Sequence, residues 1–138
     1  EGLTGKIVLY DLDSSILPDE IYSRCDLEIH GDTVMSLPEK INVRNLDLFT
    51  PNLRFLNHVE CNRLNIREAA IAYGIYERSI IETLEIEHET LNRWLEKGIK
   101  IPHNIGEVKI KYHDRVLNGL INLLLREAGY ILDVSPLE

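Results

Sequence analysis

The chain has few aromatic residues, only two cysteines and no long apolar run. Of its 138 residues, 7% are aromatic, with a single Trp and two Phe. So few rings predict a core of aliphatic side chains. The two cysteines, Cys25 and Cys61, exclude the disulfide framework of a small secreted domain, and no run approaches the roughly 18 apolar residues of a membrane span. Such cysteine usage is typical of a reduced compartment or of indifference to redox state.

Basic residues are also scarce. The chain has 15 Lys and Arg against 23 Asp and Glu, which gives a formal net charge of −8 at pH 7. Binding to nucleic acid or to an anionic membrane surface depends on clustered Lys and Arg. We therefore expect neither nucleic acid nor a membrane as partner.

The chain combines ordinary globular composition with an internal repeat. Hydrophobic residues make up 44% and charged residues 28% of a chain of one domain's length. An apolar–polar–apolar triplet returns about every 20 residues, which is the period of a solenoid. The triplets are Leu27–Ile29, Leu46–Leu48, Leu64–Ile66 and Leu84–Ile86. A step of 19 residues back reaches Val8–Tyr10, and a step of 24 residues forward reaches Val108–Ile110.

The triplets predict short parallel strands stacked on one another. Alternation with a period of two buries one face of a strand, so Leu27 and Ile29 point inward and Glu28 points outward. A strand this short cannot bury its apolar face alone, whereas stacked units bury a continuous column. The fold class predicted is α/β, a short solenoid with parallel strands and a C-terminal capping helix.

The segments between the triplets are predicted to change character along the chain. Leu17–Ile21 recurs as Leu37–Ile41, and the Pro in each favours an extended or single-turn connection. Apolar spacing predicts helices over 68–81, 88–97 and 114–129. The chain then forms one domain: residues 1–111 are a solenoid of about five or six units of ~20 residues, and residues 112–138 are a capping helix and tail.

The repeat resembles the leucine-rich repeat. A unit of about 20 residues with L-x-[IL] strands and Leu-Pro in the crossover is similar to the short-repeat bacterial versions, some of which belong to secreted effectors. The resemblance covers roughly residues 8–110, and the usual Asn of the repeat turn is absent or displaced. It implies a protein-binding module within a larger protein rather than an enzyme. It also implies a cytoplasmic location, or export by a dedicated system if the chain is an effector fragment.

In such folds the outward strand positions form the recognition surface. The outward positions run from acidic, through an Arg pair, to acidic again, and Phe49 is an aromatic residue among polar neighbours. Either they select a partner electrostatically or they are simply the solvated face of any solenoid. The predicted partner-binding residues are Glu28, His30, Asp47, Phe49, Arg63, Asn65, Arg67, Glu85 and Glu87.

A second motif points to a different function. The segment 6–15 is a hydrophobic strand followed by D-x-D-x-[ST], which resembles the first motif of haloacid-dehalogenase-like phosphotransferases. The resemblance implies that Asp11 is the nucleophile, that Asp13 is the general acid/base, and that Mg²⁺ offsets the charge between carboxylates and phosphate. The later motifs of that family are missing. The alternative prediction is thus a Mg²⁺-dependent phosphohydrolase, and the competing reading is a polar turn.

Cysteine and histidine offer weaker signals. His58 and Cys61 lie three residues apart, but a zinc site needs further ligands at suitable spacing, and the other histidines are scattered. Cys61 is better explained as a buried thiol acting as a small hydrophobe. Apart from the Mg²⁺ of the alternative, we expect no metal and no cofactor.

Overall fold

The described residues form an elongated stack of short strands. The structure is a computed structural model that describes residues 5–11, 18–69, 71–112 and 125–136. Its elements are β1 (Lys6–Tyr10), β2 (Glu20–Tyr22), β3 (Asp26–His30), β4 (Lys40–Asn42), β5 (Asn45–Phe49), β6 (His58–Asn65), β7 (Ile80–Glu87), α1 (His88–Glu96), β8 (Asn104–Tyr112) and β9 (Leu132–Pro136).

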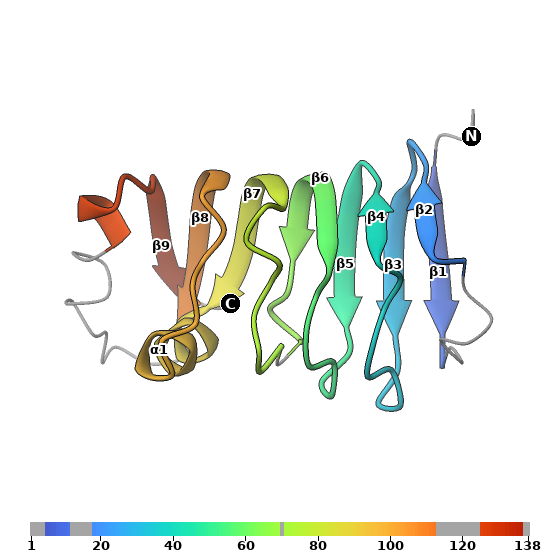
Figure 1. Cartoon of the computed structure of the whole chain (residues 1–138), viewed down its shortest axis with the longest axis horizontal. Coiled ribbons are helices and arrows are strands. Elements are labelled where there is room, and N and C mark those ends of the chain that lie inside the picture. The colour runs from blue at the N-terminus through green and yellow to red at the C-terminus, as the bar shows by residue number, and fades with distance from the viewer. Residues whose placement is uncertain (1–4, 12–17, 70, 113–124, 137–138) are drawn as a thin grey trace.

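All strand pairs are parallel and lie in two rows. The long row has the order β1-β3-β5-β6-β7-β8-β9, and the short row joins β2 to β4 and β4 to β6. Figure 1 shows β2 and β4 running upward while β1, β3 and β5 run downward, so that each turn of the chain has two legs joined at an upper corner. The predicted parallel-strand solenoid is confirmed, with about five turns.

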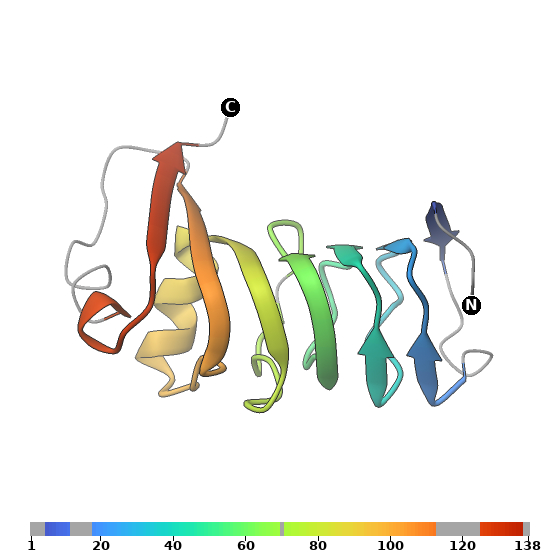
Figure 2. The same ribbon diagram turned by 90° about the horizontal axis from the view of Figure 1, so that it is seen from above.

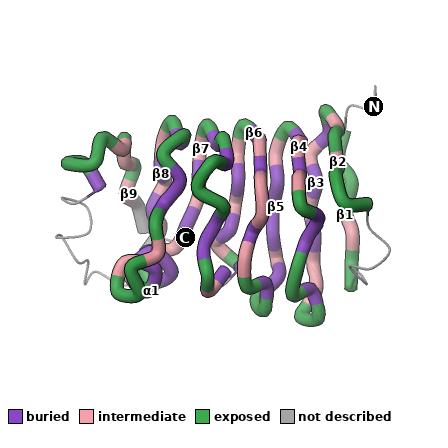
Figure 3. Tube along the Cα trace, viewed as in Figure 1, coloured by how far each residue is buried: buried purple, intermediate pink, exposed green. Residues whose placement is uncertain are grey.

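The core is an aliphatic column inside these turns. The first apolar residue of each triplet is buried and aligned with its counterpart on the next strand, and the aligned set is Leu27, Leu46, Leu64, Leu84 and Val108. Buried positions recur along the strands from β3 to β8 (Figure 3). The predicted spacing and the predicted aliphatic core are therefore both confirmed.

At β1 the predicted inward positions are wrong by one residue. The triplet Val8–Tyr10 would place Val8 and Tyr10 inward, yet the register pairs Ile7 with Leu27 and Leu9 with Ile29. Because side chains alternate along a strand, a shift of one residue moves every side chain to the opposite face. Ile7 and Leu9 therefore point toward the core, and Val8 and Tyr10 point outward.

The two Pro-containing connections lead into strands of their own. Glu20–Tyr22 and Lys40–Asn42 form β2 and β4, which pair with each other in register, with Ile21 opposite Ile41. The short row continues into the first residues of β6, where His58 is opposite Lys40. Strand β6 passes through the corner without a break and pairs with β5 further on. The second leg of each turn is thus a strand rather than a bare crossover.

The helix predicted over 68–81 is wrong for the residues that the structure describes there. Ile71 has φ of 40° and Gly74 has φ of 86°, and neither angle fits a right-handed helix. The Leu56 N–H donates to the Gly74 carbonyl, and the Tyr76 N–H donates to the Leu56 carbonyl. The segment therefore bonds to the preceding turn of the solenoid, and its internal bonds are those of tight turns, such as the one from the Gly74 N–H to the Ile71 carbonyl at 3.0 Å.

The helix predicted over 88–97 is confirmed as α1. It buries Leu91 and Trp94 against the core beside β7 and β8, at the end of the stack opposite β1 (Figure 2). The helix predicted over 114–129 lies mostly outside the described residues, of which 125–127 are helical. Beyond it, β9 adds one more parallel strand to β8. Within the described part of the chain, no helix has the length and apolar character that crossing a membrane requires.

Candidate protein-binding face

The outward face of the long row carries most of the predicted partner-binding residues. The register aligns Glu28 with Asp47, Asp47 with Asn65, and Asn65 with Glu85. A face built in this way places residues about 20 positions apart in the sequence one strand spacing apart, roughly 4.8 Å. We call this surface, formed by the outward side chains of β1, β3, β5, β6 and β7, the outward face.

Three rings form a continuous stack on the outward face. The His30 ring lies 4.4 Å from the Phe49 ring at an interplanar angle of 7°, and 4.7 Å from the Tyr10 ring at 22°. We call Tyr10, His30 and Phe49 the aromatic ladder. Tyr10 ends the ladder and is 67% exposed. Phe49 is therefore part of an aromatic surface rather than a single exposed ring.

Tyr10 is the member of this site that sequence reasoning missed. It has the same register position as His30 and Phe49 on consecutive strands of the long row. A spacing of 20 residues instead of 19 between the first two triplets would have identified it. Aligning Ile7 with Leu27 makes Tyr10 outward.

Beside the ladder, Glu28 is held by two partners. Its Oε1 lies 2.7 Å from Lys6 Nζ, and its Oε2 lies 2.5 Å from His30 Nε2. The hydrogen bond from Lys6 lowers the pKa of Glu28 most, and that from His30 lowers it further. The hydrogen bond to Glu28 in turn raises the pKa of Lys6. Glu28 thus ties β1 to β3 and orients the middle ring of the ladder.

This contact predicts a loss of stability in acid. The lowered pKa means that the unfolded chain binds more protons than the folded chain, so stability falls as the pH drops below the ordinary value of 4.5. Replacing Glu28 with Gln removes the stabilisation by the charged carboxylate. We therefore expect the urea midpoint of the variant to lie below that of the wild type at pH 7. The two midpoints should approach each other near pH 3. Glu77→Gln, at an exposed turn position, should match the wild type at both pH values. A Glu28→Gln difference that is constant with pH would contradict this account.

Arg63 connects two carboxylates across the middle of the outward face. Its Nη2 donates to both carboxylate oxygens of Asp47 at 3.0 and 3.1 Å, and its Nη1 donates to Glu85 at 2.9 Å. Burial lowers the pKa of Arg63, but the hydrogen bond with Glu85 and the charge of Asp47 raise it by more. Asp47 is only 7% exposed. These three charges are therefore satisfied within the fold.

The remaining predicted residues lie toward the far end of the outward face. Asn65 Oδ1 accepts a hydrogen bond from the backbone N–H of Arg67 at 3.1 Å, which holds the chain where it leaves β6. Glu87 lies opposite Lys111 in the register of β7 and β8. The ladder therefore occupies the β1–β5 end of the outward face, and charged side chains continue along the face to β7, which adjoins β8.

The alternative site at the N-terminal end is described in part. Asp11 follows β1, is exposed, has φ of 49°, and donates its backbone N–H to the His30 carbonyl at 2.8 Å. Asp13 lies outside the described residues. Among the residues that are described, no group of three or more His, Cys, Asp or Glu is placed to hold a metal ion. The Mg²⁺-dependent phosphohydrolase stays a prediction.

Both cysteines are buried, free thiols. Burial raises the pKa of the Cys61 thiol to about 12, against a smaller opposite effect of Arg63. A nucleophile or metal ligand must be a thiolate, and this environment disfavours the thiolate. Cys61 therefore packs as a small hydrophobic side chain in the core.

We expect the native thiols to be unreactive. In urea, both thiols of the unfolded chain react with a disulfide reagent at pH 8. In the same time, fewer than about 10% of the thiols of the native chain should react, because burial blocks access and suppresses thiolate formation. Tyr73→Cys, at an exposed turn position, provides a control thiol that should react at once. Rapid reaction of two thiols in the native wild type would contradict the burial.

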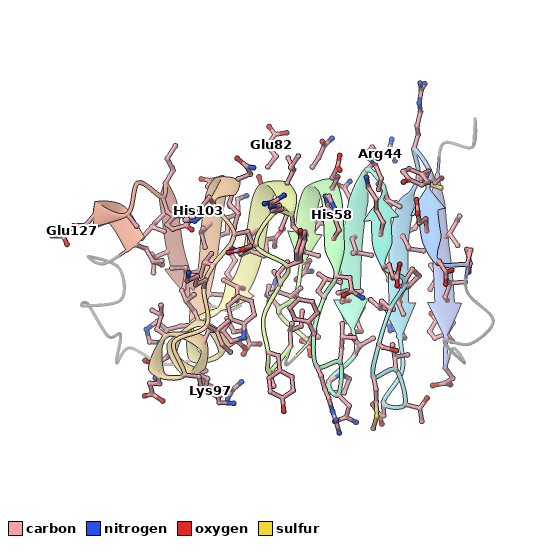
Figure 4. The ribbon with its side chains drawn as sticks, viewed as in Figure 1. Arg44, His58, Glu82, Lys97, His103 and Glu127 are labelled. Atoms are coloured by element: carbon pink, nitrogen blue, oxygen red, sulfur yellow. The ribbon has the colours of Figure 1, made fainter. Side chains whose placement is uncertain are left out.

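A hollow of about 560 Å³ lies at the upper corner of the solenoid, away from the outward face. Cys61, Ile80, Glu82, His103 and Gly106 are among its lining residues. Figure 4 shows Glu82 at the upper edge of the stack and His103 below it. This hollow shares no residue with the aromatic ladder, so the two features are separate surfaces.

Protein-family models, curated proteins and solved structures were all compared with the chain, and none of them matches it.

Proposed function

We propose that the chain is a protein–protein recognition module that binds its partner through the outward face. The observation that carries the proposal is the aromatic ladder, because the centres of protein interfaces are enriched in aromatic residues and in Arg. Tyr10, His30 and Phe49 present one continuous aromatic strip beside the charged residues of the outward face. Arg63, which is partly exposed, lies further along the same face, opposite Asn45 rather than Phe49 in the register of β5 and β6.

The ladder contributes more to this proposal than the charged residues do. Asp47 and Glu85 are engaged by Arg63, and Glu28 is engaged by Lys6 and His30. A partner's charge would have to compete with these contacts, so the charges give orientation and specificity more than affinity. Burying the exposed parts of the rings requires no such exchange.

The resemblance to short-repeat bacterial leucine-rich-repeat proteins belongs to the same proposal. The turn length of about 20 residues and the L-x-[IL] strands support it. The strands β2 and β4, which stand where such a repeat has its crossover, depart from it. A bacterial effector, exported by a dedicated system and part of a larger protein, is the form of the proposal that this resemblance favours.

A capture experiment with a matched control tests the proposal. His30→Ala with Phe49→Ala removes two rings of the ladder and leaves Arg63 and its carboxylates in place. His58→Ala with Tyr76→Ala removes one His ring and one Tyr ring from a pair on the short-row side, whose centroids lie 5.6 Å apart. Asp47→Lys is unsuitable, because Asp47 is buried against Arg63 and its loss would disturb the fold.

The immobilised wild type and both variants are incubated with lysate, and captured proteins are quantified by mass spectrometry after thermal denaturation has shown that each variant folds. We expect a protein that is captured by the wild type and the control variant and lost by at least about tenfold with the ladder variant. Equal capture by all three forms would refute binding through the ladder.

A further inference from the structure

The first strand of the long row has one edge with which no other described strand pairs. Among the described residues, β1 pairs only with β3, and Figure 1 shows it at the end of the stack opposite α1. Its side chains are apolar apart from Lys6, and Ile7 and Val8 are 38% and 37% exposed. An exposed apolar strand edge is a template for pairing with another strand.

The backbone shows which groups of β1 are free to pair. The Asp26 N–H donates to the Gly5 carbonyl at 2.7 Å, and the Asp11 N–H donates to the His30 carbonyl at 2.8 Å. Backbone groups of successive residues in a strand point to opposite edges. Gly5, Ile7, Leu9 and Asp11 therefore bond toward β3, and Lys6, Val8 and Tyr10 direct their N–H and C=O groups to the open edge.

We propose that two copies of the chain form a dimer in which their β1 strands pair antiparallel about a two-fold axis at Val8. In this register Val8 lies opposite Val8 of the second copy, and Lys6 lies opposite Tyr10 of the second copy. These are the residues whose backbone groups face the open edge, so each opposed pair exchanges both of its hydrogen bonds. The two long rows then become one continuous sheet.

The side chains are self-complementary in the same register. On the inner face, Ile7 lies opposite Leu9 of the second copy, which extends the aliphatic column across the axis. On the outer face, Lys6 meets the Tyr10 ring of the second copy, whose outer side is the uncovered end of the aromatic ladder. A cation over that ring is attracted by its π-face. Lys6 is the single charged residue of β1 and lies opposite Tyr10 of the second copy, not opposite the second Lys6, so no like charges oppose each other.

The other end of the stack is less suited to pairing. Its last strand, β9, carries the charged Asp133 and ends at Pro136, which has no N–H to donate. Each of the two strands carries one charged residue, but a proline, which protects an edge, is present in β9 and absent from β1. Pairing of β1 with β1 therefore closes as a dimer, whereas pairing of β1 with β9 would continue into a filament.

Substitutions at the two-fold axis test the dimer, because position 8 meets itself there. We expect the wild-type chain to show twice the 15.9 kDa mass of one chain in light scattering and sedimentation equilibrium. Val8→Lys and Val8→Glu should each weaken association by about 100-fold or more, since each places like charges opposite each other. An equimolar mixture of the two variants should recover the doubled mass. Val8→Thr, which keeps the shape of the side chain, should remain dimeric.

A second variant covers the case in which a charge at position 8 disturbs the fold. Val8→Pro removes the N–H that faces the open edge and leaves the hydrogen bonds from β1 to β3 in place, so it should be folded by circular dichroism and monomeric. A wild type of 15.9 kDa at all concentrations would overturn the proposal and leave the edge to a strand of another protein. A dimer that survives Val8→Lys and Val8→Pro, or a mass that grows beyond two chains, would also overturn it. None of these readouts involves His30 or Phe49, so the dimer and the recognition face fail independently.

Discussion

Replacing Leu84 with Asp is expected to destabilise the chain by at least about 4 kcal/mol, which is enough to unfold a domain of ordinary stability. Leu84 is 0% exposed and stands in the column between Leu64 and Val108. The substitution removes a buried aliphatic side chain and places a carboxylate where no water and no cation can reach it.

The neighbouring position provides the control. Thr83 lies on the same strand but points outward, opposite Arg63 in the register, so Thr83→Asp should change stability by less than about 1 kcal/mol. Urea unfolding can be followed by the fluorescence of the single Trp. A folded Leu84→Asp variant, or equal losses at both positions, would contradict the alternation on which the solenoid depends.

Replacing Trp94 with Ala is expected to cost about 3–5 kcal/mol, the range measured for truncating large buried aromatic side chains. Trp94 is the largest fully buried side chain, and α1 places it beneath the last turns of the stack. Its indole N–H donates to the Ile71 carbonyl at 2.8 Å. The truncation leaves both a cavity and an unpaired carbonyl.

Trp94→Phe separates these two contributions. Phe fills most of the cavity but cannot donate to Ile71, so we expect a smaller loss of about 1–3 kcal/mol. Both variants are measured by urea unfolding with circular dichroism, because they lack the fluorescent side chain. If Trp94→Ala cost less than about 1 kcal/mol, α1 would not be part of the core.

The long row of strands could be predicted because its signal is repeated. Each triplet is too short to identify a strand, but the register that pairs Leu27 with Leu46 and Leu84 with Val108 follows directly from the spacing of the triplets. The helix α1 was predictable for a related reason: Leu91, Trp94 and Leu95 share one helical face and Gly98 follows them.

The short row could not be predicted in the same way. Each of β2 and β4 has three residues with one aliphatic side chain, Ile21 or Ile41, and no alternation can be recognised in so little sequence. The wrongly predicted helix over 68–81 arose instead from a pattern that was present but misleading. Ile71 and Ile75 have helical spacing, but tight turns with positive φ bring them into the core instead.

The candidate face was predictable as a set of positions but not as a set of contacts. The repeat indicated which residues point outward from β3 to β8. It contained no information on the Arg63 pairing with Asp47 and Glu85, which depends on long side chains crossing between strands. Nor did the repeat reveal the ladder. The triplet predicted at β1 was one residue out of register, and this error placed Tyr10 in the core.

The distance between Tyr22 and Asn104 tests most directly whether the chain is a stacked solenoid. These residues are 82 positions apart in sequence but only four strand steps apart along the short row and its continuation, through Asn42, Glu60 and Ile80. Both are exposed, and the native cysteines are buried, so nitroxides attached to Cys at positions 22 and 104 label only these sites. Diluting the labelled chain into unlabelled chain ensures that the measured electron–electron distance joins two labels on the same molecule.

Four strand spacings amount to about 19 Å between backbones, so we predict one narrow distance distribution centred at about 20–30 Å once the label arms are included. A flexible chain of this length would span about 50 Å. A broad distribution, or a mean beyond about 35 Å, would contradict the stacking of turns on which the outward face and its aromatic ladder depend.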